Sequence, residues 1–423
     1  MLRVYIESNG CAVLRHETQR YAKFFRQNGW TEVDKPEIAD LVLMTTCGVV
    51  GWTEAKALEA IQRLCQTVKP PARLVIGGCL TKIDPEMILK IAPNVMMFGP
   101  QEEDRLDQLI GARVSIKDIT YTIGAVREHS MGDPMIAYST DEIQQLKIAE
   151  YLAHQLKQPS FLEVYDYLTR GRHLWKEDGL FEVKVASGCA HHCSYCATKI
   201  AIGEMRSQDM EVVLTQIREG VALGYSKIVL MGDEVGYYGV DIGTNLTELL
   251  HQIEKIPGNF RIAFRYIYPD VLVKLYRESD LKRFFESGRI YFFCSAFQSG
   301  SPDILRRMHR NPNIEQFADV IRDIALVAPN AYRHTQIIVG FPGETEADLA
   351  KTIQTLDACQ WDYITTTAYA DRPGTKAMLL EGHLSESEIQ RRFQTTVDYT
   401  FANRNRRIWQ RFQQQIIRNL IND

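Results

Sequence analysis

The sequence lacks several features that would assign it to a class of protein at once. It has no excess of basic charge, because 49 Lys and Arg residues are outweighed by 53 Asp and Glu residues, for a net charge of −4. This excludes a global positive field that gathers nucleic acid, although not a local basic patch. It has no apolar run of the ~18 residues that a membrane helix needs, and its first residues do not resemble a signal peptide. We therefore expect a cytoplasmic protein with no membrane partner.

Cysteines are few, and their number argues against a disulfide framework. The chain has nine, an odd count, and structural disulfides are rare in a reducing compartment. Clustered thiols in such a compartment more often bind metal or take part in chemistry. The cysteines stand at positions 11, 47, 65, 79, 189, 193, 196, 294 and 359.

Strand and helix patterns alternate along residues 1–111. The predicted strands are 2–6, 40–46 and 73–77, and the predicted helices are 17–29, 53–67 and 85–91. Apolar strands that alternate with helices form a parallel sheet covered on both faces. We therefore expect an α/β protein whose N-terminal domain is a Rossmann-like parallel sheet.

Each of these strands runs into a cysteine, namely Cys11, Cys47 and Cys79. In an open parallel sheet, the loops that leave the carboxyl ends of the strands meet at one edge, where ligands bind. The three thiols can therefore converge on a metal or cluster. They can equally be buried structural residues, since free cysteine is among the most buried residue types. Their spacing alone leaves both interpretations open.

The rest of the chain divides into three parts. Residues 112–180 carry amphipathic-helix patterns and are predicted to be a helical linker or an inserted module. Residues 181–380 are predicted to form a partial (β/α)6 barrel of the TIM type, because strands and helices alternate again. Its predicted strands are 181–185, 227–231, 261–266, 290–293, 335–339 and 363–368. Residues 381–423 are predicted to be C-terminal helices.

A second group of cysteines follows the first strand of the predicted barrel. Cys189, Cys193 and Cys196 have the spacing C-x3-C-x2-C. Thiolates are the usual ligands of a [4Fe–4S] cluster, which normally takes four, so three leave one iron open to another ligand. Zinc is the competing interpretation, but no fourth ligand nearby completes a zinc spacing. We therefore predict a cluster with one open iron.

The loop resembles the signature of the radical S-adenosylmethionine (SAM) superfamily, in which the open iron holds SAM and reductive cleavage yields a 5′-deoxyadenosyl radical. Three N-terminal motifs narrow the resemblance to the methylthiotransferases. They are Asn9-Gly-Cys11, Thr45-Thr-Cys47 and Gly77-Gly-Cys79. The resemblance implies that Cys11, Cys47 and Cys79 hold a second [4Fe–4S] cluster, the auxiliary cluster, which carries the sulfur to be transferred.

The resemblance also assigns expected contacts with SAM. Tyr195 occupies the aromatic position before the third cysteine of the loop. Asp233 and Glu234 follow the second barrel strand, and a carboxylate suits the methionine ammonium group. Gln298 and Ser299, in a Gln-Ser-Gly motif, are expected to hydrogen-bond the ribose.

Gly340 lies in a motif whose backbone is expected to meet the adenine. No side-chain acid or base is expected to act in catalysis, because the cofactors carry the difficult chemistry. The implied reaction replaces hydrogen at an unactivated C–H with sulfur and then methylates that sulfur from a second SAM. It needs a reducing partner such as flavodoxin or ferredoxin, and sulfide or another sulfur donor.

The expected substrate rests on what the sequence does not contain. The family normally continues into a small substrate-binding β-barrel, the TRAM domain, and residues 381–423 show no strand pattern that would build one. An acidic chain of this kind favours a peptide or protein side chain as acceptor. The alternative is a tRNA adenosine such as N6-threonylcarbamoyladenosine, whose branch of the family Thr198-Lys199 resembles. A second alternative is a radical SAM enzyme whose auxiliary cluster only transfers electrons or binds substrate.

Overall fold

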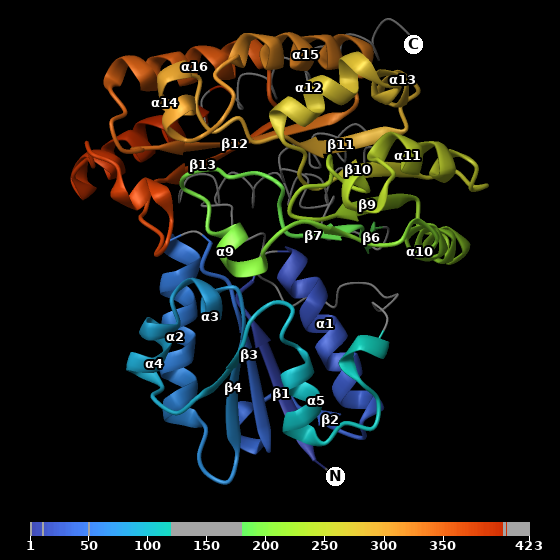
Figure 1. The fold of residues 1–423 in the computed structure, drawn as a ribbon, viewed down its shortest axis with the longest axis vertical. Coiled ribbons are helices and arrows are strands. Elements are labelled where there is room, and N and C mark those ends of the chain that lie inside the picture. The colour runs from blue at the N-terminus through green and yellow to red at the C-terminus, as the bar shows by residue number, and fades with distance from the viewer. Residues whose placement is uncertain (1, 11, 50, 120–179, 401–402, 404–423) are drawn as a thin grey trace, which may run out of the picture.

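The computed structural model describes residues 2–10, 12–49, 51–119, 180–400 and 403. Two parallel sheets dominate it, one in each half of the chain (Figure 1). The predicted α/β class is confirmed, with a parallel-sheet N-terminal domain followed by a partial barrel. Cys11 and almost all of the module predicted over 112–180 lie outside the described residues.

The N-terminal sheet has five parallel strands in the order β2-β1-β3-β4-β5. They are β1 (Arg3–Ser8), β2 (Thr31–Glu32), β3 (Leu41–Thr46), β4 (Arg73–Gly78) and β5 (Met96–Phe98). The central strand β3 is buried along its whole length. That burial explains its continuous apolar run, because helices cover both faces of the sheet.

The helices of this domain are α1 (Ala12–Gln27), α2 (Gly51–Thr67), α3 (Leu80–Ile83), α4 (Pro85–Ile91) and α5 (Asp104–Ile110), with short 3-10 turns at Pro36–Ile38 and Ile116–Asp118. Side chains of α1 and α5 share one core with the sheet, while α2 and α4 pack on its other face. The carboxyl ends of the strands point toward the barrel (Figure 1).

The barrel sheet has six strands in the order β13-β12-β11-β10-β9-β6, and every neighbouring pair is parallel. They are β6 (Leu180–Lys184), β9 (Lys227–Met231), β10 (Arg261–Phe264), β11 (Ile290–Cys294), β12 (Tyr332–Val339) and β13 (Tyr363–Ala368). The predicted strands 227–231 and 363–368 agree with β9 and β13 at both ends. No pairing closes β13 onto β6 among the described strands, so the barrel is partial.

Helices cover the outer face of this sheet, and the N-terminal domain lies on its other side (Figure 1). The covering helices are α10 (Met210–Ala222), α11 (Leu246–Glu254), α12 (Pro269–Glu278), α13 (Leu281–Glu286), α14 (Pro302–Arg307), α15 (Ile314–Val327) and α16 (Glu346–Cys359), with 3-10 turns at Val240–Ile242 and Lys376–Leu379. The short helix α9 (Thr198–Ile202) lies instead between the barrel and the N-terminal domain (Figure 1). Residues 386–400 are also helical, as predicted for the C-terminal segment. Among the described residues, no helix is long and apolar enough to cross a membrane.

The two halves of the molecule pack on each other at α9 and at α1. Cys79 and Ile83 of the N-terminal domain share a small apolar cluster with Ala197 and Ala201, which lie at and in α9. On the inner face of the barrel, Val13 of α1 packs among apolar side chains of β9, β10 and β11. These contacts bring the edge of the first sheet that carries the cysteines next to the carboxyl ends of the barrel strands.

Candidate active site

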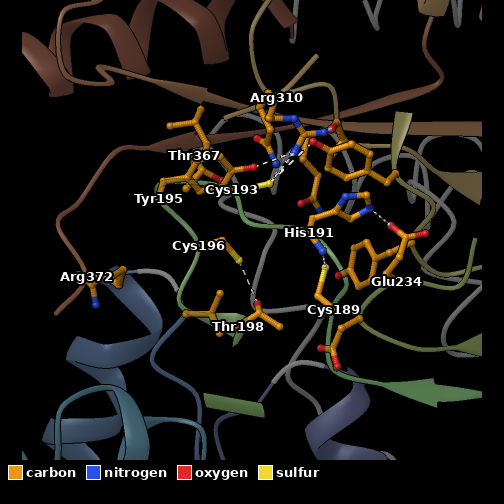
Figure 2. A pocket seen from close by; sticks show the side chains of 18 of the residues that line it. Cys189, His191, Cys193, Tyr195, Cys196, Thr198, Glu234, Arg310, Thr367 and Arg372 are labelled. Carbon is orange, nitrogen blue, oxygen red and sulfur yellow. Dashed lines mark hydrogen bonds and ion pairs between the residues drawn. The ribbon is translucent and has the colours of Figure 1, made fainter. Parts of the chain in front are cut away.

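A cavity of about 260 Å³ lies at the carboxyl ends of the barrel strands. Cys189, Cys193 and Cys196 line it, and so does Cys47 of the N-terminal domain. Figure 2 shows the three loop cysteines beside Tyr195, Arg310 and Glu234. One cavity therefore joins thiols from the two cysteine groups that the sequence predicts.

The loop that carries the three cysteines depends on a glycine. It follows the short strand β7 (Ala186–Ser187), which pairs with β8 (Arg206–Ser207). Gly188 has a φ of +77°, and a Cβ there would lie 2.2 Å from the carbonyl oxygen of Glu204. The Gly188 amide donates to Asp233 Oδ2 at 2.9 Å. Only glycine accepts both this backbone conformation and this close approach.

Farther along, the loop is anchored to the C-terminal end of α14. Ser194 Oγ donates to the carbonyl oxygen of Arg307 at 2.8 Å, and the Ser194 amide donates to that of Met308 at 3.0 Å. The Cys196 thiol donates to Thr198 Oγ1 at 3.2 Å. The loop is therefore held at both ends by bonds that leave its thiols beside the cavity.

Arg310 places a positive charge among these thiols. Its guanidinium donates to Tyr195 Oη at 2.9 Å and to the Ala296 carbonyl at 2.7 Å, and Nη1 lies 3.9 Å from Cys193 Sγ. Its Cζ stands 4.2 Å from the ring centroid of Tyr268, within range of a cation–π contact. A charge fixed in this way compensates the negative charge that three thiolate ligands would bring.

Burial affects the protonation of two of the loop thiols, Cys189 and Cys196. It raises the pKa of Cys189 to about 12 and also raises the pKa of Cys196. Both thiols are therefore protonated at neutral pH in the metal-free protein. Ligands of a cluster must lose these protons, so metal binding would be coupled to proton release.

The two predicted carboxylates occupy different environments. Burial raises the pKa of Asp233 to about 6 and that of Glu234 to about 8. Asp233 accepts the Gly188 amide and so supports the cysteine loop. Glu234 Oε1 accepts the Gly236 amide at 2.7 Å, and Oε2 faces His191 Nε2 at 3.7 Å.

His191, inside the cysteine loop, completes this wall of the cavity. Its ring stacks on Tyr268 with centroids 3.5 Å apart and meets the edge of Tyr237 at 5.1 Å. Burial lowers the pKa of His191 to about 4, so the imidazole is neutral at pH 7. Glu234 is also largely protonated there, and the two groups therefore face each other as neutral partners.

Of the other four residues predicted to contact SAM, two line the cavity and two do not. Tyr195 and Gln298 line the cavity, and Gln298 Oε1 is buried without a hydrogen-bond partner. Ser299 lies outside the lining, where its Oγ accepts the Ser301 amide at 3.2 Å. Gly340 also lies outside it, and its amide donates to Glu344 Oε2 at 2.8 Å.

Cys47 and Cys79, the two described cysteines that the sequence assigns to the auxiliary cluster, are both buried at the domain boundary. The Cys47 amide donates to Asn9 Oδ1 at 3.1 Å, and Asn9 Nδ2 donates to the Thr53 carbonyl at 2.8 Å. Cys79 immediately precedes α3 and packs against the end of the loop that carries the other three thiols. Arg372, which follows β13, also lines the cavity.

A partial parallel barrel with three thiols from its first loop, set in a cavity at the strand ends, defines the class of radical SAM enzymes. The comparison with protein families agrees. The model described as "Radical SAM superfamily" matches residues 183–356, and the one described as "Uncharacterized protein family UPF0004" matches residues 3–99.

Curated relatives match this chain over most of its length. A protein of Pyrococcus abyssi named "Probable threonylcarbamoyladenosine tRNA methylthiotransferase" is 29% identical over 378 residues, which is 89% of this chain and 79% of that protein. The "Threonylcarbamoyladenosine tRNA methylthiotransferase MtaB" of Thermotoga maritima is 28% identical over 401 residues, which is 93% of this chain and 80% of that protein. With the two family models, these relatives show that the chain belongs to the radical SAM methylthiotransferase family and is a transferase.

Among solved structures, the radical SAM methyltransferase TsrM from Kitasatospora setae superposes with a TM-score of 0.56. It is 14% identical, and the match covers 89% of this chain and 77% of that chain. At this identity the likeness supports the fold alone. Membership of the radical SAM family implies a [4Fe–4S] cluster and SAM as cofactors.

The expected peptide or protein acceptor is wrong. Five curated relatives, from Pyrococcus, Methanothermobacter, Thermotoga and Archaeoglobus, are all named as threonylcarbamoyladenosine tRNA methylthiotransferases. The expectation failed because net charge describes the whole chain. Substrate binding depends on the charges of the surface around the site, and a net charge of −4 for the whole chain does not describe that surface.

Proposed function

We propose that this chain installs a methylthio group on N6-threonylcarbamoyladenosine in tRNA. The observation that carries the proposal is the single cavity lined by Cys47 together with Cys189, Cys193 and Cys196. A reaction that joins sulfur to a carbon radical needs both held in one enclosed space. The substrate class follows from relatives that match 89% to 93% of this chain.

In this proposal, Cys189, Cys193 and Cys196 hold the radical SAM cluster. The donor set fits, because the three thiols line one cavity and Arg310 stands beside Cys193. When bound, such a cluster supplies the electron that cleaves SAM into methionine and a 5′-deoxyadenosyl radical, which takes hydrogen from the acceptor carbon. Arg310 places its positive charge beside the cysteine loop. Asp233 holds the loop by accepting a hydrogen bond from the Gly188 amide.

Two lining residues are assigned to SAM. Glu234 is a buried carboxyl at the cavity wall and would accept hydrogen bonds from the methionine amino group. Gln298 has a buried, unpartnered Oε1 that would accept from a ribose hydroxyl. Tyr195 supports the cluster through Arg310 and does not need to contact SAM itself.

Cys11, Cys47 and Cys79 are assigned to the auxiliary cluster. Cys47 reaches the cavity, and Cys79 packs with Ala197 and Ala201, directly after the cysteine loop. The proposal includes a reducing partner such as flavodoxin or ferredoxin, because cleavage of SAM consumes electrons. It also includes sulfide or another sulfur donor, because the transferred sulfur must be replaced after each turnover.

Mass spectrometry of tRNA nucleosides tests the function. We expect cells that express the enzyme to contain a threonylcarbamoyladenosine that has gained one methylthio group in place of one hydrogen. Cells without the enzyme should contain only the unmodified nucleoside. The proposal fails if the nucleoside profile is the same in both, or if the methylthio group is found on a different nucleoside.

A further inference from the structure

A side chain of the barrel reaches into the N-terminal domain beside Cys47. Arg372 follows β13 in the Arg372-Pro-Gly-Thr375 motif and is only 7% exposed. Its Nη1 forms an ion pair with the Glu54 carboxylate, in the first turn of α2. Nη1 also donates to the carbonyl oxygen of Gly48 at 3.5 Å. Because Gly48 directly follows Cys47, this arginine holds the backbone next to that thiol.

The surrounding packing leaves little room for movement. A Cβ built on Gly51 would lie 3.1 Å from Ala370 Cβ and 3.3 Å from Arg372 Nη2, so the start of α2 lies directly against the barrel. Figure 2 shows Arg372 immediately above this helix. Arg372 is buried and Glu54 is partly buried, so solvent screens this ion pair less than a surface pair, and loss of one partner leaves the other charge uncompensated.

The same segment is held from the opposite side by its own domain. The Cys47 amide donates to Asn9 Oδ1, and Asn9 Nδ2 donates to the Thr53 carbonyl. Asn9 therefore fixes the Cys47 segment relative to the first sheet. Arg372 supplies a fixed point relative to the barrel, where the other three thiols lie.

We propose that Arg372 is a positioning residue that sets the place of Cys47 relative to the loop of Cys189, Cys193 and Cys196. The inference rests on the proposed function, since it takes Cys47 as a ligand of the auxiliary cluster. Transfer of sulfur to a carbon radical requires near-contact geometry, and a displacement of ~1 Å can cost ~100-fold in rate. Loss of Arg372 removes no cysteine but loosens the segment of Cys47 relative to the loop of Cys189, Cys193 and Cys196.

Hydrogen exchange in the metal-free full chain tests the positioning directly. Arg372→Met and Glu54→Gln should each accelerate amide exchange within residues 47–60 and leave the barrel strands unchanged. Arg283→Met is the matched control, because Arg283 forms a similar pair with Glu254, at 2.8 and 2.9 Å, on the outside of the barrel. Unchanged exchange at 47–60, or an increase spread over both halves, would overturn the inference.

The loaded enzyme gives a second readout. Arg372→Met should still form 5′-deoxyadenosine, while the methylthio nucleoside falls by about 100-fold. Arg372→Lys keeps the charge near Glu54 and should recover part of the product. A parallel fall of both products, or no fall in either, contradicts the positioning role. If the wild-type enzyme forms no methylthio nucleoside, the proposed function fails, whereas the hydrogen-exchange result stands independently.

Discussion

At the scale of single residues, the cavity gathers charged and ionisable groups that the fold alone does not require. Arg310 lies between Tyr195, Cys193 and the ring of Tyr268. Within the described part of the chain, buried Glu234 has no cationic partner close enough for a strong ion pair, since His191 is neutral at pH 7. Both residues are therefore expected to act on ligands of the cavity.

Arg310→Gln should make the radical SAM cluster harder to reduce. Removing a positive charge beside the cluster destabilises the reduced form, which carries one more negative charge. The midpoint potential should shift to a more negative value in an EPR-monitored titration, and SAM cleavage should slow with it. Arg283→Gln, remote from the cavity, should leave the potential unchanged. An unchanged potential in Arg310→Gln would show that its charge does not act on the cluster.

Glu234→Gln should stabilise the metal-free protein, and more so at alkaline pH. Burial raises the pKa of Glu234 from 4.5 to about 8 in the folded protein. The unfolded chain therefore loses this proton first, so folding stability falls as pH rises from about 4.5 to 8. A neutral glutamine avoids this loss, which is on the order of a few kcal/mol at pH 8.

Thermal unfolding at pH 5 and pH 8 checks this prediction. The gain in Tm of Glu234→Gln over wild type should be larger at pH 8. Binding of SAM to the cluster-loaded variant should be weaker, because the carboxylate is gone. An equal gain at both pH values would show that the Glu234 carboxyl does not titrate as its burial implies.

At the scale of elements, the loop of three cysteines depends on the backbone of Gly188. Gly188→Ala combines a left-handed conformation with a Cβ only 2.2 Å from the Glu204 carbonyl oxygen. We expect the loop to lose its shape and iron to fall by about half, from roughly eight atoms per chain to four. Gly224→Ala is the matched control, because Gly224 has a φ of +91° but nothing within 4 Å of its Cβ. Equal iron content in the two variants would contradict the prediction.

The sequence predicted the long elements well and missed the short ones. The helix 85–91 and the strands 227–231 and 363–368 match the structure, because each has a clear period and a clear end. The strands β2 and β5, of two and three residues, went unpredicted, since so few residues carry no period. Helix α1 begins at Ala12, earlier than the predicted residue 17, because Cys11, which precedes it in the sequence, is not one of the residue types that mark a helix start.

The cysteine spacing predicted the loop of the candidate site but could not place its neighbours. Asp233, Glu234, Tyr195 and Gln298 reach the cavity as the motif order suggested. Ser299 and Gly340 belong to the same motifs, yet their polar atoms bond within the protein. Whether a motif residue faces the cavity depends on strand register and local backbone, which sequence order does not determine.

At the scale of the whole molecule, the two sheets present their carboxyl edges to each other. Cys47 and the three loop cysteines are far apart in the chain and meet because contacts such as those of Val13, Cys79 and Arg372 join the halves. Sequence reasoning could assign each cysteine group to a sheet edge. It could not show that the edges face each other, because that depends on contacts between distant segments.

A chain with two clusters should bind about eight irons after anaerobic reconstitution. Cys47→Ala should lower this number and leave the Cys189, Cys193 and Cys196 loop loaded. Cys65→Ala is the control, because Cys65 packs in the core around α2 and does not line the cavity. About four irons in the wild-type chain would contradict the two-cluster account.

The most direct test of that account follows two products in one reaction. Reconstituted wild-type enzyme, a reductant, SAM and a tRNA that carries threonylcarbamoyladenosine should yield both 5′-deoxyadenosine and the methylthio nucleoside. Cys47→Ala should yield 5′-deoxyadenosine without the methylthio nucleoside, and Cys65→Ala should yield both. If Cys47→Ala still forms the methylthio nucleoside at the wild-type rate, Cys47 does not serve sulfur transfer and the account is wrong.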